Sequence, residues 1–250
     1  MPIYEKPVWQ LMHDMVKDLN LQPGETLSKA QVVAWFRRKY PLIKQGTISA
    51  HLIRLSTNAP TRLHYNAKPR QDDLFYQLDG SRFRLYDSER DPAPLWTKEQ
   101  TTTALEEPAE ENEENEEPTA FAYERDLQNF LARNLGLIEP GLHLYEEDDI
   151  TGIEFPVGGR FIDILALDRH NNYVVVELKV SRGYDRVVGQ LLRYMAWIET
   201  HQAEPGQRVR GVIIAREISE DLRLACSRIA DVQLFEYALS VSLKPIVAGS

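Results

Sequence analysis

The chain has 250 residues, 43% hydrophobic side chains and a formal net charge of −9, and none of its apolar runs approaches the roughly 20 residues of a membrane span. Charges interspersed through residues 1–20 leave no apolar core for a signal peptide, and the single cysteine excludes an internal disulfide and a cysteine-based zinc site. We therefore expect a soluble, cytoplasmic protein of two modest domains with no membrane partner.

Residues 8–56 predict three short helices. Apolar residues recur at helical spacing from Val8 to Leu19. Ser28-Lys29-Ala30-Gln31 has the form of a capping box that opens a second helix, which Pro41 ends. A third helix is predicted from Thr47 to Ser56, with Ile48, Leu52 and Leu55 on its buried face.

A hairpin follows the three helices. Residues 72–78 and 82–86 read as strands around Asp79-Gly80-Ser81, where Gly80 supplies the freedom for a turn. This order of elements is that of a winged helix-turn-helix, which predicts a nucleic-acid-binding domain over residues 1–90. Residues 26–86 hold 11 Lys or Arg against three Asp, a balance that suits contact with phosphate.

In a winged helix the third helix lies in the major groove of duplex DNA. It would present Thr47, Ser49, His51 and Arg54, while Arg82 and Arg84 would project from the wing and Lys44 and Arg62 could reach the DNA backbone. The alternative is a domain that binds protein, in which the basic residues only interact with water.

An acidic segment separates this domain from the rest of the chain. Residues 106–117 hold eight glutamates, no basic residue and no apolar side chain larger than alanine. Such a segment cannot bury enough surface to offset the entropy of ordering, so residues 91–119 are predicted to form a flexible linker. It is either a plain spacer or an autoinhibitory phosphate mimic that occupies a basic groove.

Three charged residues interrupt two strongly apolar segments. Glu177 and Lys179 lie two apart in residues 173–180, and Asp163 lies in residues 161–167, with a turn-rich stretch between the segments. A hairpin would bring the three side chains together. Two carboxylates can hold a hard divalent cation that acidifies water, and a lysine can position the attacking water. The competing interpretation is a solvated face or an ion pair at a sheet edge.

The next segment, from Arg186 to Ile198, predicts a helix with one buried face. Gln190 and Tyr194 are four residues apart and so share one side of that helix. A helix that packs back across the sheet could bring Gln190 near the carboxylates. Alternatively, Gln190 is a boundary polar residue and Tyr194 belongs to the core.

These residues resemble a known superfamily. Asp163, Glu177-Leu178-Lys179 and the pair Gln190 and Tyr194 look like the D, (D/E)xK and QxxxY elements of PD-(D/E)xK nucleases. Over residues 120–240 the chain more narrowly resembles the C-terminal catalytic domain of NucS-type endonucleases. The segments that carry this resemblance are 159–163, 174–179, 190–194 and 209–215.

The resemblance implies a restriction-endonuclease-like α/β core at residues 120–245, built from a helix, three antiparallel strands, a second helix and a further strand, with Mg²⁺ or Mn²⁺ as cofactor. Asp163, Glu177 and the Leu178 carbonyl would hold the metal, Lys179 would orient or help deprotonate water, and Gln190 would support the site. The first helix of such domains commonly contributes an acidic residue to the site, and the resemblance assigns this role to Glu124. Alternatively, a glutamate near a helix start simply complements the helix dipole.

Three further elements complete the prediction. Residues 209–215 and 232–237 read as strands, and residues 219–229 as a helix capped by Ser219. Arg160 follows a Gly-Gly turn into the Asp163 strand and could place a cation beside the scissile phosphate.

The N-terminal half departs from the NucS pattern, which has a β-rich DNA-binding domain, so substrate preference does not carry over. We predict a metal-dependent DNA endonuclease acting on duplex DNA, in restriction or anti-phage defence or in repair, with a homodimer as an open option. The alternatives are a non-catalytic winged-helix regulator and an RNA nuclease.

Overall fold

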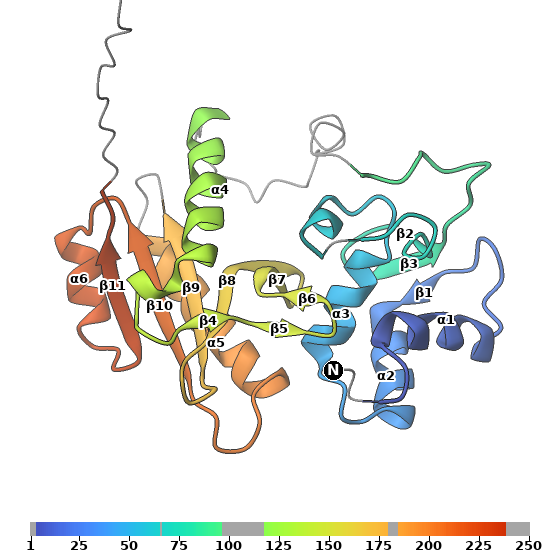
Figure 1. The fold of residues 1–250 in the computed structure, drawn as a ribbon, viewed down its shortest axis with the longest axis horizontal. Coiled ribbons are helices and arrows are strands. Elements are labelled where there is room, and N and C mark those ends of the chain that lie inside the picture. The colour runs from blue at the N-terminus through green and yellow to red at the C-terminus, as the bar shows by residue number, and fades with distance from the viewer. Residues whose placement is uncertain (1–3, 66, 97–117, 180–184, 239–250) are drawn as a thin grey trace, which may run out of the picture.

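The computed structural model describes residues 4–65, 67–96, 118–179 and 185–238, and the side chains of residues 118–123 and 185 are not described. The chain folds into two mixed α/β parts that pack against each other (Figure 1). We call residues 4–96 the N-terminal module and residues 118–238 the C-terminal domain. Most of the predicted linker, residues 97–117, lies outside the described residues.

The N-terminal module consists of helices followed by a hairpin, with one short extra strand. Strand β1 pairs antiparallel with β3, which pairs antiparallel with β2, giving the sheet order β1-β3-β2. The elements in chain order are α1 (Val8–Asp18), β1 (Leu27–Ser28), α2 (Lys29–Lys39), α3 (Gln45–Arg54), the 3-10 helix η1 (Pro60–Tyr65), β2 (Phe75–Gln77) and β3 (Arg82–Leu85).

Local sequence signals account for most of these boundaries. The Ser28 hydroxyl accepts a hydrogen bond from the Gln31 amide (3.2 Å), and the Gln31 side chain accepts one from the Ser28 amide (2.8 Å), so the predicted capping box is confirmed. The Asp79 carboxylate accepts hydrogen bonds from two backbone amides of the hairpin turn, those of Ser81 and Arg82. Sequence analysis missed β1 and η1, which are too short to carry a periodic pattern.

The C-terminal domain is a six-stranded mixed sheet with helices on both faces. Its main path is β11-β10-β9-β8-β4, with β7 also paired to β8; β9, β10 and β11 are parallel, and the other pairings are antiparallel. The elements are α4 (Pro118–Arg133), η3 (Leu135–Leu137), β4 (His143–Leu144), β5 (Glu146–Glu147), β6 (Ile150–Thr151), β7 (Ile153–Val157), β8 (Arg160–Leu167), β9 (Tyr173–Lys179), α5 (Asp185–His201), β10 (Val209–Ala215), α6 (Glu220–Cys226) and β11 (Val232–Glu236).

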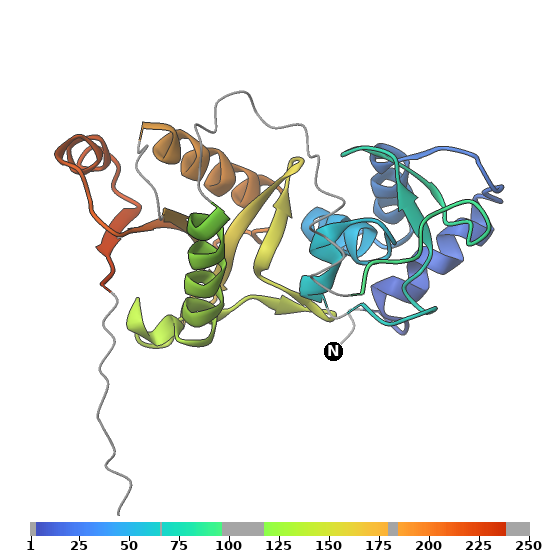
Figure 2. The same ribbon diagram turned by 90° about the horizontal axis from the view of Figure 1, so that it is seen from above.

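Helix α4 covers one face of the sheet and helix α5 the other (Figure 2). The alternation of β9 sends Val174, Val176 and Leu178 into the core on the α4 side and leaves Glu177 and Lys179 on the α5 side. Gly211 of β10 lets α5 approach closely, because an added Cβ would lie 2.7 Å from the Leu191 side chain. Glu177 and Lys179 therefore emerge under α5, where the predicted packing of this helix across the sheet would place Gln190 near them.

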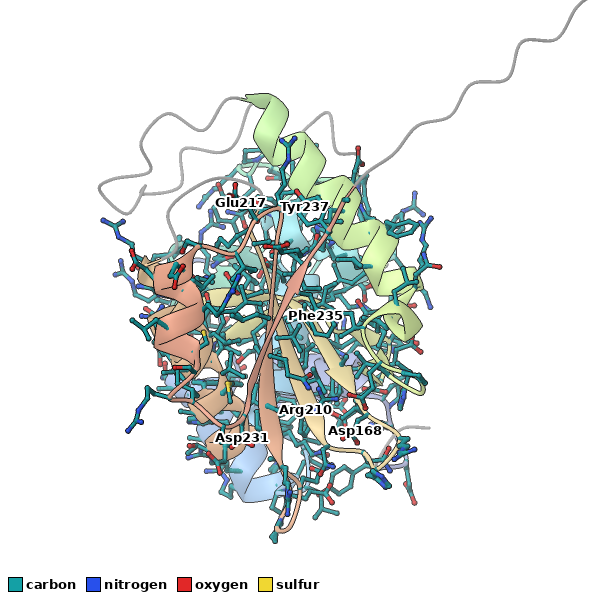
Figure 3. All side chains as sticks on the ribbon, turned by 90° about the vertical axis from the view of Figure 1, so that its left-hand side faces the viewer. Asp168, Arg210, Glu217, Asp231, Phe235 and Tyr237 are labelled. Atoms are coloured by element: carbon teal, nitrogen blue, oxygen red, sulfur yellow. The ribbon has the colours of Figure 1, made fainter. Side chains whose placement is uncertain are left out.

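Strand β11 forms the edge of the sheet beside α6 and α4 (Figure 3). Arg210, at the start of β10, makes a 2.6 Å ion pair with Glu139. By the β9–β10 register it pairs with Val174, five residues before Lys179. This arginine therefore lies at the opposite end of the strands from the charged cluster.

Helix α3 is buried along its whole length between the two parts of the protein. Ala50, Ile53 and Tyr65 share a hydrophobic cluster with Phe155 and other residues of the C-terminal domain. We expected a polar face of this helix to be accessible, so that expectation is corrected. The physical reason is packing: Gly46 offers a side-chain-free surface, and an added Cβ there would meet Phe155 and Gln202 within 3 Å. Among the described residues, no helix is long and apolar enough to cross a bilayer.

Candidate active site

Asp163 and Glu177 lie opposite each other on neighbouring strands. The β8–β9 register pairs Ile164 with Val176, and one further step places Asp163 across from Glu177. The backbone amide of Leu178 donates a 2.6 Å hydrogen bond to Asp163 Oδ2, which fixes the carboxylate against β9. The predicted hairpin therefore brings the two carboxylates together.

Lys179, Gln190 and Tyr194 complete this cluster around Glu177. Lys179 Nζ lies 3.2 Å from Glu177 Oε1. Gln190 Nε2 donates to the same oxygen at 2.8 Å and to the hydroxyl of Tyr194 at 3.1 Å. One turn of α5 thus holds the Glu177 carboxylate in a fixed orientation. Gln190 is therefore more than a polar residue at the boundary of the core, because it bonds directly to Glu177.

The charges of the cluster perturb one another strongly. Burial raises the pKa of Asp163 to about 6, and burial together with the nearby Asp163 raises the pKa of Glu177 well above its ordinary value. Burial alone would lower the pKa of Lys179, but the carboxylates of Glu177, Asp163 and Glu124 raise it. Two carboxylates forced together in a half-buried site are a typical mark of a functional site.

Glu124 lies close enough to this cluster to act on it electrostatically. Its charge raises the pKa values of Asp163, Glu177 and Lys179. Glu124 comes from α4 and Asp163 from β8. Glu177 and Lys179 come from β9, and Gln190 and Tyr194 come from α5. The structure therefore brings together all of the predicted nuclease residues from four separate segments of the chain.

The donor set fits a hard divalent cation. Glu177 Oε2 is buried and has no hydrogen-bond partner, so this oxygen can accept a metal bond without losing another contact. A cation would also relieve the repulsion between the two carboxylates. Within the described ranges no three His, Cys, Asp or Glu side chains form a ready ligand set. A cation held by Asp163 and Glu177 would need backbone or water oxygens to complete its coordination.

A second layer of polar residues supports Asp163 and was missed from the sequence. Gln128 of α4 is buried, and its Nε2 donates to the Asp163 carbonyl at 2.9 Å and to Glu154 Oε1 at 2.8 Å. Glu154 has a left-handed backbone conformation (φ 51°), and its carbonyl accepts a 2.6 Å hydrogen bond from Tyr65 of the N-terminal module. Gln128 lies four residues after Glu124 and therefore on the same side of α4, and this spacing is the sequence signal that could have identified it.

Comparison with known proteins concerns mainly the C-terminal domain. Residues 123–231 match the family model described as the endonuclease NucS C-terminal domain. The C-terminal domain is NucS-like. Endonuclease NucS of Pyrococcus furiosus is 31% identical over 109 residues, which are 43% of this chain and 37% of that protein. Endonuclease NucS of Methanocaldococcus jannaschii is 26% identical over 158 residues, which are 62% and 55% of the two chains.

Solved structures and the N-terminal half complete the comparison. A repair endonuclease from Pyrococcus abyssi aligns over 50% of this chain and 49% of its own at 24% identity, with a TM-score of 0.39. An EndoMS complex with double-stranded DNA aligns over 52% and 50% at 24% identity, with a TM-score of 0.38. Residues 7–85 match a domain of unknown function, DUF7669. The chain thus spans well under two thirds of the NucS proteins it matches.

Arg160 begins β8 directly after the NucS-like domain's Gly158-Gly159 turn. Both glycines have positive φ (55° and 88°), so the predicted tight turn is present. Arg160 is half-buried and lies three residues before Asp163 on the same strand. Its contact with a phosphate stays a prediction.

Several residues expected to contact DNA have internal partners instead. Buried Arg62 donates to the carbonyls of Arg54, Thr57 and Asp72 and stacks on Trp96 at 4.4 Å, so it braces the module. Burial lowers the pKa of this guanidinium. Buried Arg54 lies 3.1 Å from Asp72. Both are corrections to the expected exposure, because each side chain is fully enclosed.

The other predicted contacts differ in accessibility. Buried Ser49 donates to the Gln45 carbonyl, and buried His51 contacts the Thr47 carbonyl, with burial lowering the His51 pKa to about 3. The remaining three are at least partly exposed. Lys44 lies 3.4 Å from Glu204, Arg84 pairs with Asp91, and Arg82 lies exposed on the hairpin, 2.6 Å from Asp79.

Proposed function

We propose that the protein is a metal-dependent DNA endonuclease that hydrolyses phosphodiester bonds. The observation that carries the proposal is the pairing of Asp163 with Glu177 beside Lys179 in a NucS-like domain. Glu177 is buried and Asp163 and Lys179 are half-buried, so these charges are costly to hold together, and phosphodiester hydrolysis is a chemistry that uses all three.

In this proposal Asp163, Glu177 and the Leu178 carbonyl would hold Mg²⁺ or Mn²⁺. The bound cation supplies Lewis-acid stabilisation of the phosphate and lowers the pKa of water. The unpartnered Glu177 Oε2 supports this assignment. The side chains around the carboxylates would orient the attacking water and keep Glu177 in position.

Lys179 orients the attacking water. Its raised pKa keeps the ammonium protonated, so Nζ can donate a hydrogen bond to water or to a phosphate oxygen. Gln190 holds Glu177 in orientation and is itself aligned by Tyr194. Glu124 would position a water molecule or a second cation from the α4 side.

The substrate proposed for the whole chain is duplex DNA. The N-terminal module has the element order helix, strand, helix, helix and hairpin of a winged helix, and its exposed Arg82 lies on the wing. We propose the boundaries 1–90, 91–119 and 120–245 for the winged helix, linker and nuclease. Repair is the setting favoured by the NucS-like domain, with restriction or anti-phage defence as the competing setting.

The full chain can be tested with supercoiled, linear, branched and single-stranded DNA and with single-stranded RNA, in Mg²⁺, Mn²⁺ or chelator. We expect metal-dependent cleavage of DNA, lost in Asp163→Ala and Lys179→Ala. Asp231→Asn, which changes an exposed residue at the far edge of the domain, serves as the control and should cleave normally.

The possible outcomes separate the proposals. Persistent cleavage by Asp163→Ala would remove this mechanism. Cleavage of RNA alone would replace the substrate class while leaving the site in place. Tight DNA binding without cleavage in either metal would identify a non-catalytic regulator.

A further inference from the structure

Three side chains on one face of α3 meet a run of consecutive carboxylates from the C-terminal domain. Thr47, His51 and Arg54 are spaced four and three residues apart, so they form one stripe along the helix. Opposite them lie β5 and the turn that joins it to β6, residues 146–149, which we together call the acidic turn. The facing pairs are Thr47 with Glu147, His51 with Asp148 and Arg54 with Asp149.

These contacts leave strong hydrogen-bond donors unsatisfied. The Arg54 side chain is fully buried, yet Nη1 and Nη2 have no hydrogen-bond partner, and Nη1 lies 3.6 Å from Asp149. His51 Nε2 is also buried without a hydrogen bond, 3.6 Å from Asp148. Because the ring is neutral and Nδ1–H faces the Thr47 carbonyl, Nε2 is an unpaired acceptor that faces a carboxylate. A permanent interface normally satisfies such groups, because a buried unpaired donor costs free energy. The α3 stripe is therefore imperfectly matched to the acidic turn.

The free guanidinium nitrogens border a pocket large enough for further ligand atoms. The pocket has a volume of about 510 Å³ and lies between Arg54, Lys68 and the acidic turn. Lys68 is exposed at its rim. The two cations on the module side would face phosphate oxygens if the acidic turn moved away.

A helix N-terminus also points at the same turn. The backbone amide of Val8, the first residue of α1, donates a 2.6 Å hydrogen bond to Asp148 Oδ2. Backbone amides at helix starts are typical ligands for phosphate. Asp148 thus occupies a position where an anion meets both α1 and the α3 stripe, as DNA backbone phosphates do in helix-turn-helix complexes.

The contact can open without unfolding the module. The core of the N-terminal module consists of fifteen buried residues between Val8 and Phe83, all from the module itself. Only Ala50, Ile53, Ala59 and Tyr65 of the module belong to the cluster shared with the C-terminal domain. Most of the hydrophobic stabilisation of the module is therefore independent of the interface.

We propose that the polar stripe of α3 is a duplex-DNA-binding surface that the acidic turn occupies as a phosphate mimic, so that DNA and the turn compete for the same helix. This inference rests on the proposed DNA-binding function. The polar stripe of α3 contacts DNA only when the N-terminal module has separated from the C-terminal domain. The protein therefore has a closed state and a DNA-bound open state.

Two variants open the contact by different means. Glu147→Gln/Asp148→Asn/Asp149→Asn removes the charges of the acidic turn. Gly46→Leu keeps every charge but places a side chain where even a Cβ would lie 2.5 Å from Gln202 and 2.7 Å from Phe155. The three atoms nearest to that added Cβ all belong to Gln202 and Phe155 of the C-terminal domain. The second variant therefore acts on the interface rather than on the fold of the module.

Each variant has a matched control. Glu217→Gln/Glu220→Gln/Asp221→Asn removes the same number of negative charges from exposed positions around α6, at the opposite end of the molecule (Figure 1). Gly136→Leu makes the same substitution where no atom lies within 4 Å of the added Cβ. The first control measures the effect of net charge alone, and the second measures the effect of an added leucine alone.

The measurement is fluorescence anisotropy of the full-length variants with a labelled DNA duplex, in chelator and over a range of salt concentrations. We expect both opening variants to bind about tenfold more tightly than the native chain at low salt, and the two controls to stay within about twofold. The opening variants should also show a steeper dependence of affinity on salt, because more phosphates are contacted. Small-angle X-ray scattering should show a larger radius of gyration for Gly46→Leu.

Unchanged DNA affinity in a Gly46→Leu protein that scattering shows to be open would overturn the inference. An equal gain from the charge control and the acidic-turn variant would do the same, as would a gain for RNA duplexes alone. If Gly46→Leu fails to fold, the acidic-turn variant carries the test. Metal-dependent DNA cleavage by the native chain, measured separately, shows whether the proposed function stands when this inference fails.

Discussion

Asp163→Asn should stabilise the metal-free protein at neutral pH while it abolishes cleavage. The pKa of Asp163 is raised by burial from its ordinary value of 3.8 to about 6. This difference corresponds to about 3 kcal/mol of unfavourable free energy for the ionised carboxylate in the folded state. Asparagine has nearly the same shape, keeps an oxygen for the Leu178 amide and carries no charge, so the variant avoids this cost.

The effect has a defined pH window. Because the folded-state pKa lies above the unfolded-state value, the folded native chain binds more protons between pH 3.8 and about 6. Its stability therefore falls as the pH rises through that window, and the full cost applies above it. The raised pKa of Glu177 acts in the same direction. The advantage of Asp163→Asn should thus be near zero at pH 4 and largest at pH 7 to 8.

Urea unfolding followed by circular dichroism measures this difference. At pH 8 in chelator the midpoint of Asp163→Asn should lie roughly 1 M above that of the native chain, given a slope of about 3 kcal/mol/M. Asp231→Asn, which removes an exposed carboxylate, should leave the midpoint unchanged. Added Mn²⁺ should stabilise the native chain and not the variant. A variant that is less stable than the native chain at pH 8, or a difference independent of pH, would refute the reasoning.

Three further substitutions test the supports of the site and of the module. Gln128→Leu leaves the Asp163 carbonyl and Glu154 without their donor, so it should lower the free energy of unfolding by about 2 kcal/mol. Calorimetry should also show weaker Mn²⁺ binding, and an unchanged Mn²⁺ affinity would contradict the positioning role. Ser28→Ala removes the capping box and should cost about 1 kcal/mol in thermal unfolding, with DNA cleavage unaffected. Arg62→Met removes a buried brace and leaves Asp73 without its partner at 3.0 Å, so it should cost about 3 kcal/mol in urea unfolding; a cost below 1 kcal/mol would mean that Arg62 is not structural.

Most elements of both parts followed from local sequence patterns. The periodic apolar residues of α1 and α5 and the continuous apolar runs of β8, β9 and β10 are strong signals, and the Ser28 and Ser219 caps mark helix starts by short-range hydrogen bonds. The strands β4 to β6 were missed, because each has only two residues and carries no pattern. The acidic turn was therefore not recognised as a separate feature.

The clustering of Asp163, Glu177 and Lys179 could be predicted from sequence because charges inside buried strands are anomalous wherever they occur. Glu177 and Lys179 interrupt an apolar run, and strand alternation fixes both on one side of the sheet. Gln128 could not be assigned in this way, because a glutamine on a helix is ordinary until the fold places it beside the Asp163 carbonyl.

The sequence by itself determined the helices, the apolar strands and the charged cluster, because each depends on residues that are close in the chain or on one hairpin. Only the tertiary structure decided that α3 lies against the acidic turn. That contact joins Thr47 to Glu147, 100 residues apart, and depends on Gly46 fitting against Phe155. Exposure of a basic helix cannot be read from its own residues, because it depends on which distant surface packs against it.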